Sequence, residues 1–298
     1  MVHQLSLVSS IPHNKYLQTI STLQALTGLV QPQPISTYTL ISKPSTVFKP
    51  KFEPGKVNQI EQYFMKCITN WRDDSIDISK PILKDGDIVS ARRLFRPDDK
   101  TERVWTLQIS DIPIAGKNQG CCQQTVYEST LVHTHTRIDL NLEDKVKEGK
   151  DDFEDFIEID PPEDSEVDSK KTEDALAEQR RASFLVFLQD LGYEVINQFW
   201  IKGIRFFHGD IIIEIFKVLI RDDTTANNST AERIKLKLLD ESNTFQIRVY
   251  MNVSKSTDVE QINHGTKELI KLQEFLKNLF ILEIPDRIFM DSRVTLTK

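Results

Sequence analysis

The sequence is poor in cysteine and glycine, and each shortage excludes a class of protein. Its three cysteines among 298 residues are an odd number, and two of them, Cys121 and Cys122, are adjacent. This is a poor framework for disulfide bonds and is typical of a reducing compartment. The ten glycines form neither a phosphate-binding loop of the Walker type nor a dinucleotide-binding fingerprint. We therefore expect neither a disulfide-stabilised secreted domain nor a nucleotide-binding enzyme of those two types.

A long hydrophobic run is also missing. Asp210, Glu214 and Lys217 interrupt the most apolar region, so no stretch approaches the roughly 20 apolar residues that span a bilayer. Residues 1–11 alternate apolar and polar positions and lack the basic region and apolar block of a secretory signal. We predict a soluble globular protein that is neither exported nor bound to a membrane.

Negative charge is concentrated in one segment. Residues 139–174 contain 16 acidic residues and five lysines, a formal charge of −11; the whole chain carries −7, and the remainder therefore carries +4. With few apolar residues and a Pro161-Pro162 pair, this segment cannot bury enough surface to offset the entropy of ordering, so we predict a disordered acidic insert. The weakly basic remainder has no basic clusters interleaved with aromatic residues, which argues against direct sequence-specific binding of nucleic acid.

Four apolar residues inside the acidic insert form a candidate docking motif. Carboxylates surround Phe153, Phe156, Ile157 and Ile159, and would keep these side chains in water and available to a groove on a basic partner. The alternative is a linker whose aromatic residues have no function. These four residues are the candidate partner-binding site.

Alternation of apolar and polar residues indicates a mainly β protein with some helix, an α+β fold. Strands are predicted at 88–95, 104–112, 122–138, 193–207, 211–220, 234–239 and 245–253, and residues 59–68 fit either a strand or a helix. The two strands joined by the turn at Gly209 carry apolar residues on both faces, so both faces should be covered. A proline-rich segment, 31–55, is predicted to be irregular.

Three segments have the period of an amphipathic helix. They are 14–26, which stops at Gly28, then 173–191, which stops at Gly192, and a third that begins where Thr257 and Glu260 have capping-box spacing. Strand-bearing parts therefore lie on both sides of the acidic insert. We predict that 1–138 and 175–298 form one domain, interrupted by 139–174.

No convincing set of catalytic residues is present in the sequence. His133 and His135 point the same way along a predicted strand and could share a metal ion, but no third ligand can be named, and two solvated histidines are the simpler interpretation. Cys121 and Cys122 have no basic neighbour that would lower a thiol pKa, so we interpret them as small apolar residues. Trp105 and Trp200 lie in strand patterns and are predicted to pack in the core.

Several segments, taken in their order along the chain, resemble the Mediator subunit 18 family of RNA polymerase II transcription. The signature segment is Trp105-Thr-Leu-Gln-Ile-Ser-Asp-Ile-Pro-Ile-Ala-Gly116, followed by Gln124-Thr125. The opening Gln4-Leu-Ser-Leu7, the passage from Asn252 to Asp258 that enters a helix, and the closing Ile284-Pro-Asp-Arg-Ile-Phe-Met-Asp-Ser-Arg-Val294 are also similar. The resemblance omits the acidic insert and much of the proline-rich segment.

The resemblance implies one antiparallel β-barrel of about eight to twelve strands with flanking helices, similar to the tunnel RNA triphosphatases. It implies a non-catalytic coactivator subunit in the nucleus, in the head module of Mediator. Its implied partners are subunit 20, the C-terminal helix of subunit 8, other head subunits and RNA polymerase II. No cofactor is implied.

The tunnel triphosphatases provide an enzymatic alternative, a metal-dependent barrel phosphohydrolase. Those enzymes hold metal with alternating glutamates on strands, in the pattern Glu-x-Glu-x-Lys. The nearest match here, Glu214-Ile-Phe-Lys217, lacks the glutamate pair, and Glu158-Ile-Asp160 runs into two prolines. We therefore expect the fold without the activity, and neither catalytic nor metal-binding residues.

Overall fold

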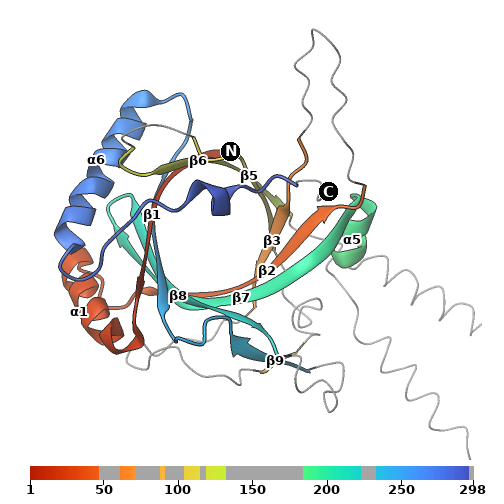
Figure 1. Ribbon diagram of the computed structural model, residues 1–298, viewed down its shortest axis with the longest axis horizontal. Helices are drawn as coiled ribbons and strands as arrows, with labels where there is room; N and C mark the ends of the chain where they lie inside the picture. Colours follow the sequence, from red (N-terminus) through yellow and green to blue (C-terminus); the bar gives the residue numbers. More distant parts are fainter. Residues whose placement is uncertain are drawn as a thin grey trace, which may run out of the picture.

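Antiparallel pairing closes eight strands into a ring, which Figure 1 shows from one end of the computed structural model. The order around the ring is β10 (Phe245–Val253), β1 (Val2–Ile11), β6 (Cys122–Leu131), β5 (Trp105–Ser110), β3 (Met65–Asn70), β2 (Gln33–Pro44), β7 (Tyr193–His208) and β8 (Ile211–Arg221). Pairing of β8 with β10 completes the barrel, and the predicted fold is confirmed. The structure describes residues 1–46, 61–71, 88–90, 104–114, 119–131, 184–222 and 233–294.

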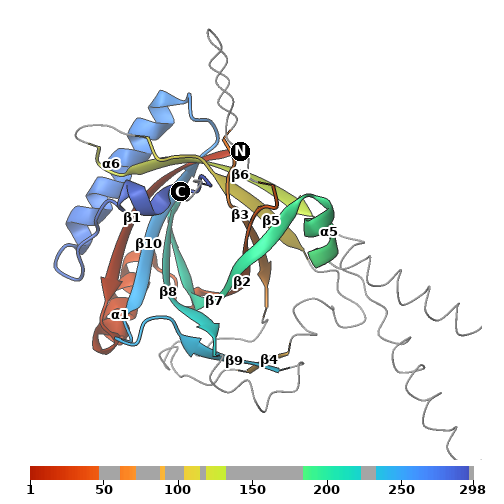
Figure 2. The same cartoon turned by 45° about the vertical axis from the view of Figure 1, so that its right-hand side comes forward.

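Two further strands extend away from the ring. The end of β8 leaves β10 and pairs with β9 (Arg233–Leu238), which in turn pairs with β4 (Ile88–Ser90). Figure 2 shows this short ribbon beside the barrel. The strands predicted over 88–95 and 234–239 are confirmed for the described residues.

The hairpin of β7 and β8 has the turn that the sequence predicts. Gly209 has a φ of 57°, a left-handed conformation that glycine adopts without a steric penalty. Nine cross-strand pairs follow, from His208 and Ile211 to Trp200 and Leu219. The hairpin therefore supplies two adjacent strands of the barrel.

The irregular segment predicted over 31–55 is wrong for Gln33–Pro44, which form β2 and pair with both β3 and β7. Pro34 and Pro44 lie near the two ends of this strand, where a missing N–H interrupts little of the ladder. Between them the residues are mostly β-branched or aromatic, and this preference decides the structure.

In the part of the chain that the structure describes, three helices cover the outside of the barrel: α1 (Tyr16–Thr27), α5 (Phe184–Asp190) and α6 (Val259–Leu276). One apolar cluster joins α1 and α6 to β1, β7, β8 and β10, and a second joins α5 to β2, β3 and β5. Both clusters use the same face of every strand, so the opposite face points into the barrel. None of the described helices is long and apolar enough to cross a bilayer.

The helix ends agree with the sequence signals except at α6. Gly28 and Gly192 follow α1 and α5 with positive φ, as predicted, while residues 173–183 of the predicted second helix lie outside the described residues. The predicted capping box at Thr257 is wrong: Asp258 is the N-cap of α6, and its carboxylate accepts a hydrogen bond from the amide of Gln261. Asp and Thr both cap helices, and the chain enters the helix one residue later.

Candidate functional site

The inward face of the barrel carries a cluster of charged side chains. Glu214 stands on β8, and the strand register places Arg205 of β7 and Arg248 of β10 directly beside it on either side. Its neighbours along β8, Ile213 and Ile215, point outward into the apolar cluster with α1 and α6. Glu214 therefore points inward, and it is only 2% exposed.

Two arginines hold the Glu214 carboxylate. Arg205 donates from Nε and Nη2 to Oε1 at 2.9 and 2.6 Å, and Arg248 donates from Nε and Nη2 to Oε2 at 3.0 and 2.6 Å. The hydroxyl of Tyr250 donates to Oε1 at 3.2 Å. Both carboxylate oxygens are therefore occupied, and the contacts connect three adjacent strands.

The two guanidiniums also determine the charge state of Glu214. Burial alone would raise its pKa, but the positive charges of Arg248 and Arg205 outweigh burial and leave the pKa below its usual value. The carboxylate is thus ionised and paired at neutral pH. Within the described residues, no three His, Cys, Asp or Glu side chains come together as a metal-binding group.

Lys217, three residues after Glu214, does not join this cluster. It lies on the outward face, where Nζ donates to the backbone carbonyl of Asn243 at 3.0 Å and stands 4.3 Å from the centroid of the Phe245 ring. Burial lowers its pKa from 10.5 to about 8. Glu214 and Lys217, which form the nearest match to the metal-binding pattern of the tunnel triphosphatases, therefore lie on opposite faces of β8.

A second polar site lies at one rim of the barrel, where the C-terminal strap, residues 281–294, crosses the strand ends. The strap is the dark blue segment that crosses the ring in Figure 1. At its start Glu283 exchanges two backbone hydrogen bonds with Val8, and at its end Ser292 accepts from Phe64 while Val294 donates to Gln62, all at 2.8 Å. The strap thus joins β1 to the chain just before β3.

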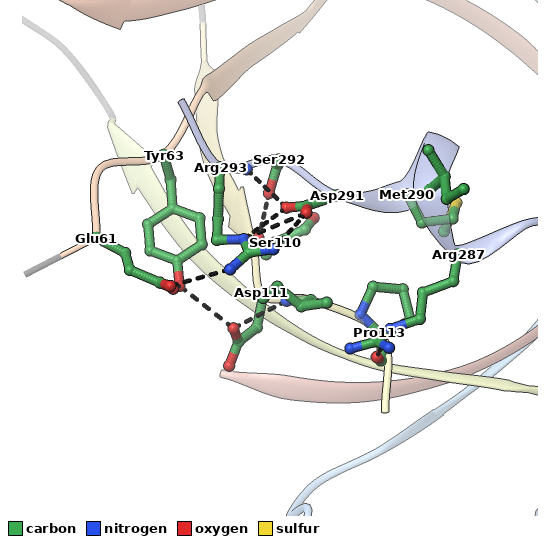
Figure 3. A network of polar contacts seen from close by, with 12 residues as sticks. Glu61, Tyr63, Ser110, Asp111, Pro113, Arg287, Met290, Asp291, Ser292 and Arg293 are labelled. Atoms are coloured by element: carbon green, nitrogen blue, oxygen red, sulfur yellow. Dashed lines mark hydrogen bonds and ion pairs between the residues drawn. The ribbon is translucent and has the colours of Figure 1, made fainter. Parts of the chain in front are cut away.

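Side-chain hydrogen bonds also join the strap to the signature segment (Figure 3). Arg287 Nε donates to the carbonyl of Pro113 at 2.9 Å, and Ser292 donates to the carbonyl of Ser110. Gln124, on the inward face of β6, donates to the carbonyls of both Asp111 and Met290. Two of the family-like segments, far apart in sequence, are therefore in direct contact.

Arg293 is the centre of the ion pairs at this rim. It pairs with Asp291 at 2.7 Å and with Glu61 at 3.0 Å, and Tyr63 donates to Glu61 and to Asp111 (Figure 3). The hydrogen bond from Arg293 lowers the pKa of Asp291, and Asp291 in turn raises the pKa of Arg293. Both groups are charged across the physiological range.

The structure places several residues that the sequence analysis singled out. Trp105 and Trp200 are fully buried, as predicted, and Trp105 stacks on Phe184 of α5 with ring centroids 3.9 Å apart. Cys121 and Cys122 are buried free thiols, and burial raises the pKa of each, which agrees with their interpretation as apolar residues.

The remaining candidates cannot be compared with the structure. His133, His135 and the docking residues all lie outside the described residues, as does Glu158 with Asp160. The docking residues are Phe153, Phe156, Ile157 and Ile159. The roles considered for all these residues stay predictions.

The partners of Glu214 could not be recognised from the sequence. A carboxylate inside the run Ile211-Ile-Ile-Glu-Ile-Phe216 was a signal, because a buried charge needs a partner. Arg248 lies in an alternating strand, where an arginine is expected on the polar face, and Arg205 lies in a strand with apolar residues on both faces. Nothing local to either residue indicates that it reaches Glu214.

Known proteins resemble this chain over almost its full length. A sequence model of the family described as Med18 protein matches residues 3–293. Mediator of RNA polymerase II transcription subunit 18 of Candida albicans is 55% identical over 350 residues, covering 99% of each chain. The protein of that name from Scheffersomyces stipitis is also 55% identical, over 355 residues and the whole of both chains.

A solved structure has a similar fold. A chain in the structure of the Schizosaccharomyces pombe Mediator head module gives a TM-score of 0.56 at 13% identity, and the similarity covers 95% of this chain and 98% of that one. At this identity the likeness shows the fold alone. The match of the family sequence model and the relatives above 50% identity show more: the chain belongs to the Med18 family, whose named members are Mediator subunit 18.

Proposed function

We propose that this protein is a non-catalytic subunit of the Mediator head module, which supports RNA polymerase II transcription in the nucleus through protein–protein contacts. The observation that carries the proposal is the family match over residues 3–293. The similar fold of a chain in the S. pombe head module supports the same placement.

The absence of an enzymatic activity is part of the proposal. Metal-dependent phosphoryl chemistry needs carboxylate oxygens that are free to bind a cation. Arg205 and Arg248 instead occupy both oxygens of Glu214. We expect no hydrolysis of nucleoside triphosphates or of RNA 5′-triphosphate ends with Mg²⁺ or Mn²⁺. Turnover above blank that vanished in Glu214→Gln would favour the barrel phosphohydrolase instead.

The proposed partners are Mediator subunit 20, the C-terminal helix of subunit 8, other head subunits and RNA polymerase II. Large apolar side chains on the outer surface are consistent with extensive contacts. They include Phe275 on α6, Ile281 at the start of the strap, and Ile288 and Phe289 on η4 (Arg287–Met290); Phe289 is 87% exposed.

The acidic insert offers a further contact in this proposal. Phe153, Phe156, Ile157 and Ile159 would dock into a groove on a basic partner, with the surrounding carboxylates providing long-range attraction. Substituting all four by serine keeps the charge and removes the apolar groups. If they dock, the variant should co-purify less of that partner, while an equal yield would identify the insert as a linker.

Purification of the tagged chain from its own cells tests the main proposal. Mediator subunits, with subunits 20 and 8 among them, should co-purify. A melt of the recombinant chain with subunit 20 and with the helical peptide of subunit 8 should show stabilisation, about 2.7 kcal/mol when a partner is present at a hundred times its dissociation constant. Recovery of the chain without any Mediator subunit would contradict the proposal.

A further inference from the structure

Helix α5 covers an aromatic floor on the outside of the barrel. The floor consists of Tyr38 of β2, Trp105 of β5 and Trp200 of β7, all of them fully buried. The centroid of the Tyr38 ring lies 6.2 Å from that of Trp105 and 4.9 Å from that of Trp200. Phe184, the first residue of α5, stacks on Trp105 with an angle of 6° between the ring planes. The helix therefore lies across side chains from three strands.

The contact between α5 and the floor is small. The helix has seven residues, and only Phe184 and Leu188 are buried, while Leu185 between them is 40% exposed. A helix of this length is not stable alone in water, because its few hydrogen bonds do not offset the cost of forming the first turn. Helix α6, in contrast, has 18 residues and a buried face of three leucines. Helix α5 therefore depends chiefly on its two buried side chains.

The closed position of α5 leaves a polar group of the floor unsatisfied. The indole N–H of Trp105 is buried and has no hydrogen-bond acceptor in the part of the chain that the structure describes. A buried donor without an acceptor costs free energy, which contact with water would recover. Because Phe184 stacks directly on Trp105, its departure would give water access to this ring. Opening therefore loses apolar contacts but also removes an unfavourable one.

The chain has a hinge directly after α5. Gly192 has a φ of 80°, and its carbonyl accepts a hydrogen bond from the amide of Ser45 at 2.8 Å. From the next residue, Tyr193, the chain is paired with Pro44 at the end of β2. Glycine can absorb large changes in backbone angles, and such residues often form hinges. Helix α5 can therefore swing about Gly192 while β7 stays in the sheet.

The barrel does not need α5 to stay closed. The eight strands of the ring pair with one another, and no pairing involves this helix. The apolar cluster under α1 and α6 is separate from the one that contains α5, and both views show α5 across the barrel from those two helices (Figures 1 and 2). Elements with few buried apolar contacts open first in local unfolding. Loss of the α5 contacts would leave the larger cluster intact.

We propose that α5 is a lid that opens and closes over the Trp105 floor while the barrel stays folded. In the closed state Phe184 covers the floor, and in the open state the protein presents an aromatic surface on the side of the barrel. The lid is a conformational device of the fold, and the inference is independent of the proposed role in Mediator.

Amide hydrogen exchange of the unaltered full chain tests the lid directly. The amide of Leu191 donates to the carbonyl of Phe187 at 2.9 Å, so its exchange reports the opening of α5. It should exchange at least about a hundredfold faster than the amides of Leu269 and Leu272 in α6. Low urea should accelerate exchange in α6 and not in α5, because local opening exposes little new surface. Equal rates and equal urea dependence in both helices would overturn the proposal.

Tryptophan fluorescence provides the second arm of the test. The chain has three tryptophans, Trp71, Trp105 and Trp200, and all belong to the cluster under α5. Phe184→Ala should increase the quenching of their emission by acrylamide severalfold, because it weakens the hold of the lid. Leu185→Ala, at the exposed position of the same helix, is the matched control and should be quenched as the unaltered chain is.

Urea unfolding followed by circular dichroism shows whether the barrel is affected. Both variants should unfold in one cooperative transition. Unchanged quenching in Phe184→Ala would mean that α5 does not control access to the floor, and this result would overturn the proposal. A loss of cooperative unfolding in Phe184→Ala would overturn it too, because the barrel would then depend on the helix.

Discussion

Glu214 links three adjacent strands of the barrel through its two arginine partners. Its carboxylate bonds to arginines on both neighbouring strands, so removing it would leave two guanidiniums without their acceptor. A buried carboxylate without partners would instead take up a proton, because desolvation raises its pKa. The pairing therefore determines both the charge of the barrel interior and the contribution of this residue to stability.

The stability of the protein should depend on pH through Glu214. Because its pKa is lowered in the folded state, its contribution is complete above the unfolded pKa, near 4.5, and is lost as the pH falls through the folded pKa. Glu214→Gln should start about 1–3 kcal/mol less stable at neutral pH, since buried donors lose a charged acceptor. It should then lose less stability on acidification than the unaltered chain.

Urea unfolding over a range of pH values measures both effects. Glu241→Gln, at an exposed position, is the control and should follow the unaltered chain. If the free energy of unfolding falls equally at low pH in Glu214→Gln and in the unaltered chain, Glu214 does not contribute to the loss of stability in acid.

At the scale of elements, α6 lies close to the barrel because Gly265 faces it. A Cβ atom at this position would come within 2.7 Å of Leu5 Cδ1 and 2.9 Å of Met251 Sδ, so any side chain forces the helix or its neighbours to move. Leu269, Leu272 and Leu276 continue the same face of the helix in the core. The close approach is thus what allows this leucine face to reach the sheet.

Gly265→Val should destabilise the protein by about 1–3 kcal/mol, because it overpacks the contact with β1 and β10. His264→Val puts the same side chain on the exposed side of the same helix and should cost no more than about 0.5 kcal/mol. Chemical unfolding of both variants decides. Equal losses would attribute the effect to helix propensity, not to packing.

The C-terminal strap is an element held mainly by polar contacts. Arg293→Gln should loosen its end, because the ion pairs with Asp291 and Glu61 disappear. Partly exposed pairs are worth about 0.2–1 kcal/mol each, so amide hydrogen exchange at Phe64 and Val294 should accelerate severalfold.

Lys277→Gln provides a matched comparison for the strap. It removes an exposed ion pair with Glu274 and should leave the exchange of the Phe64 and Val294 amides unchanged. If both amides exchange as slowly in Arg293→Gln as in the unaltered chain, the backbone hydrogen bonds hold the strap without the ion pairs.

At the scale of the whole molecule, strands from both sides of the acidic insert complete one ring: those before the insert form one continuous arc, and those after it form the other. β2 pairs with β7, and β1 pairs with β10, so neither part of the chain can close a barrel alone. These non-local pairings require the two parts to meet during folding. The insert therefore connects two parts of one barrel in the sequence.

Deleting 139–174 and bridging the gap with a glycine-serine linker should preserve folding, because the composition of the segment cannot support a core. The shortened chain should unfold in one cooperative transition, with a melting temperature within a few degrees of the full chain. Loss of cooperativity would show that the insert contributes to the packed structure.

The sequence by itself determined most of the strands, because the alternation of apolar and polar residues is visible within a single strand. Trp105 and Trp200 were recognised as core residues for that reason, and the family-like segments were recognised because their order is written in the chain. The strand β2 was missed because prolines at its ends outweighed the residues between them. Only the tertiary structure decided which inward residues meet. Glu214 and Arg248 are 34 residues apart in sequence, and Arg293 and Glu61 are 232 apart. Such contacts form only when the ring closes, so the local pattern of residues cannot predict them.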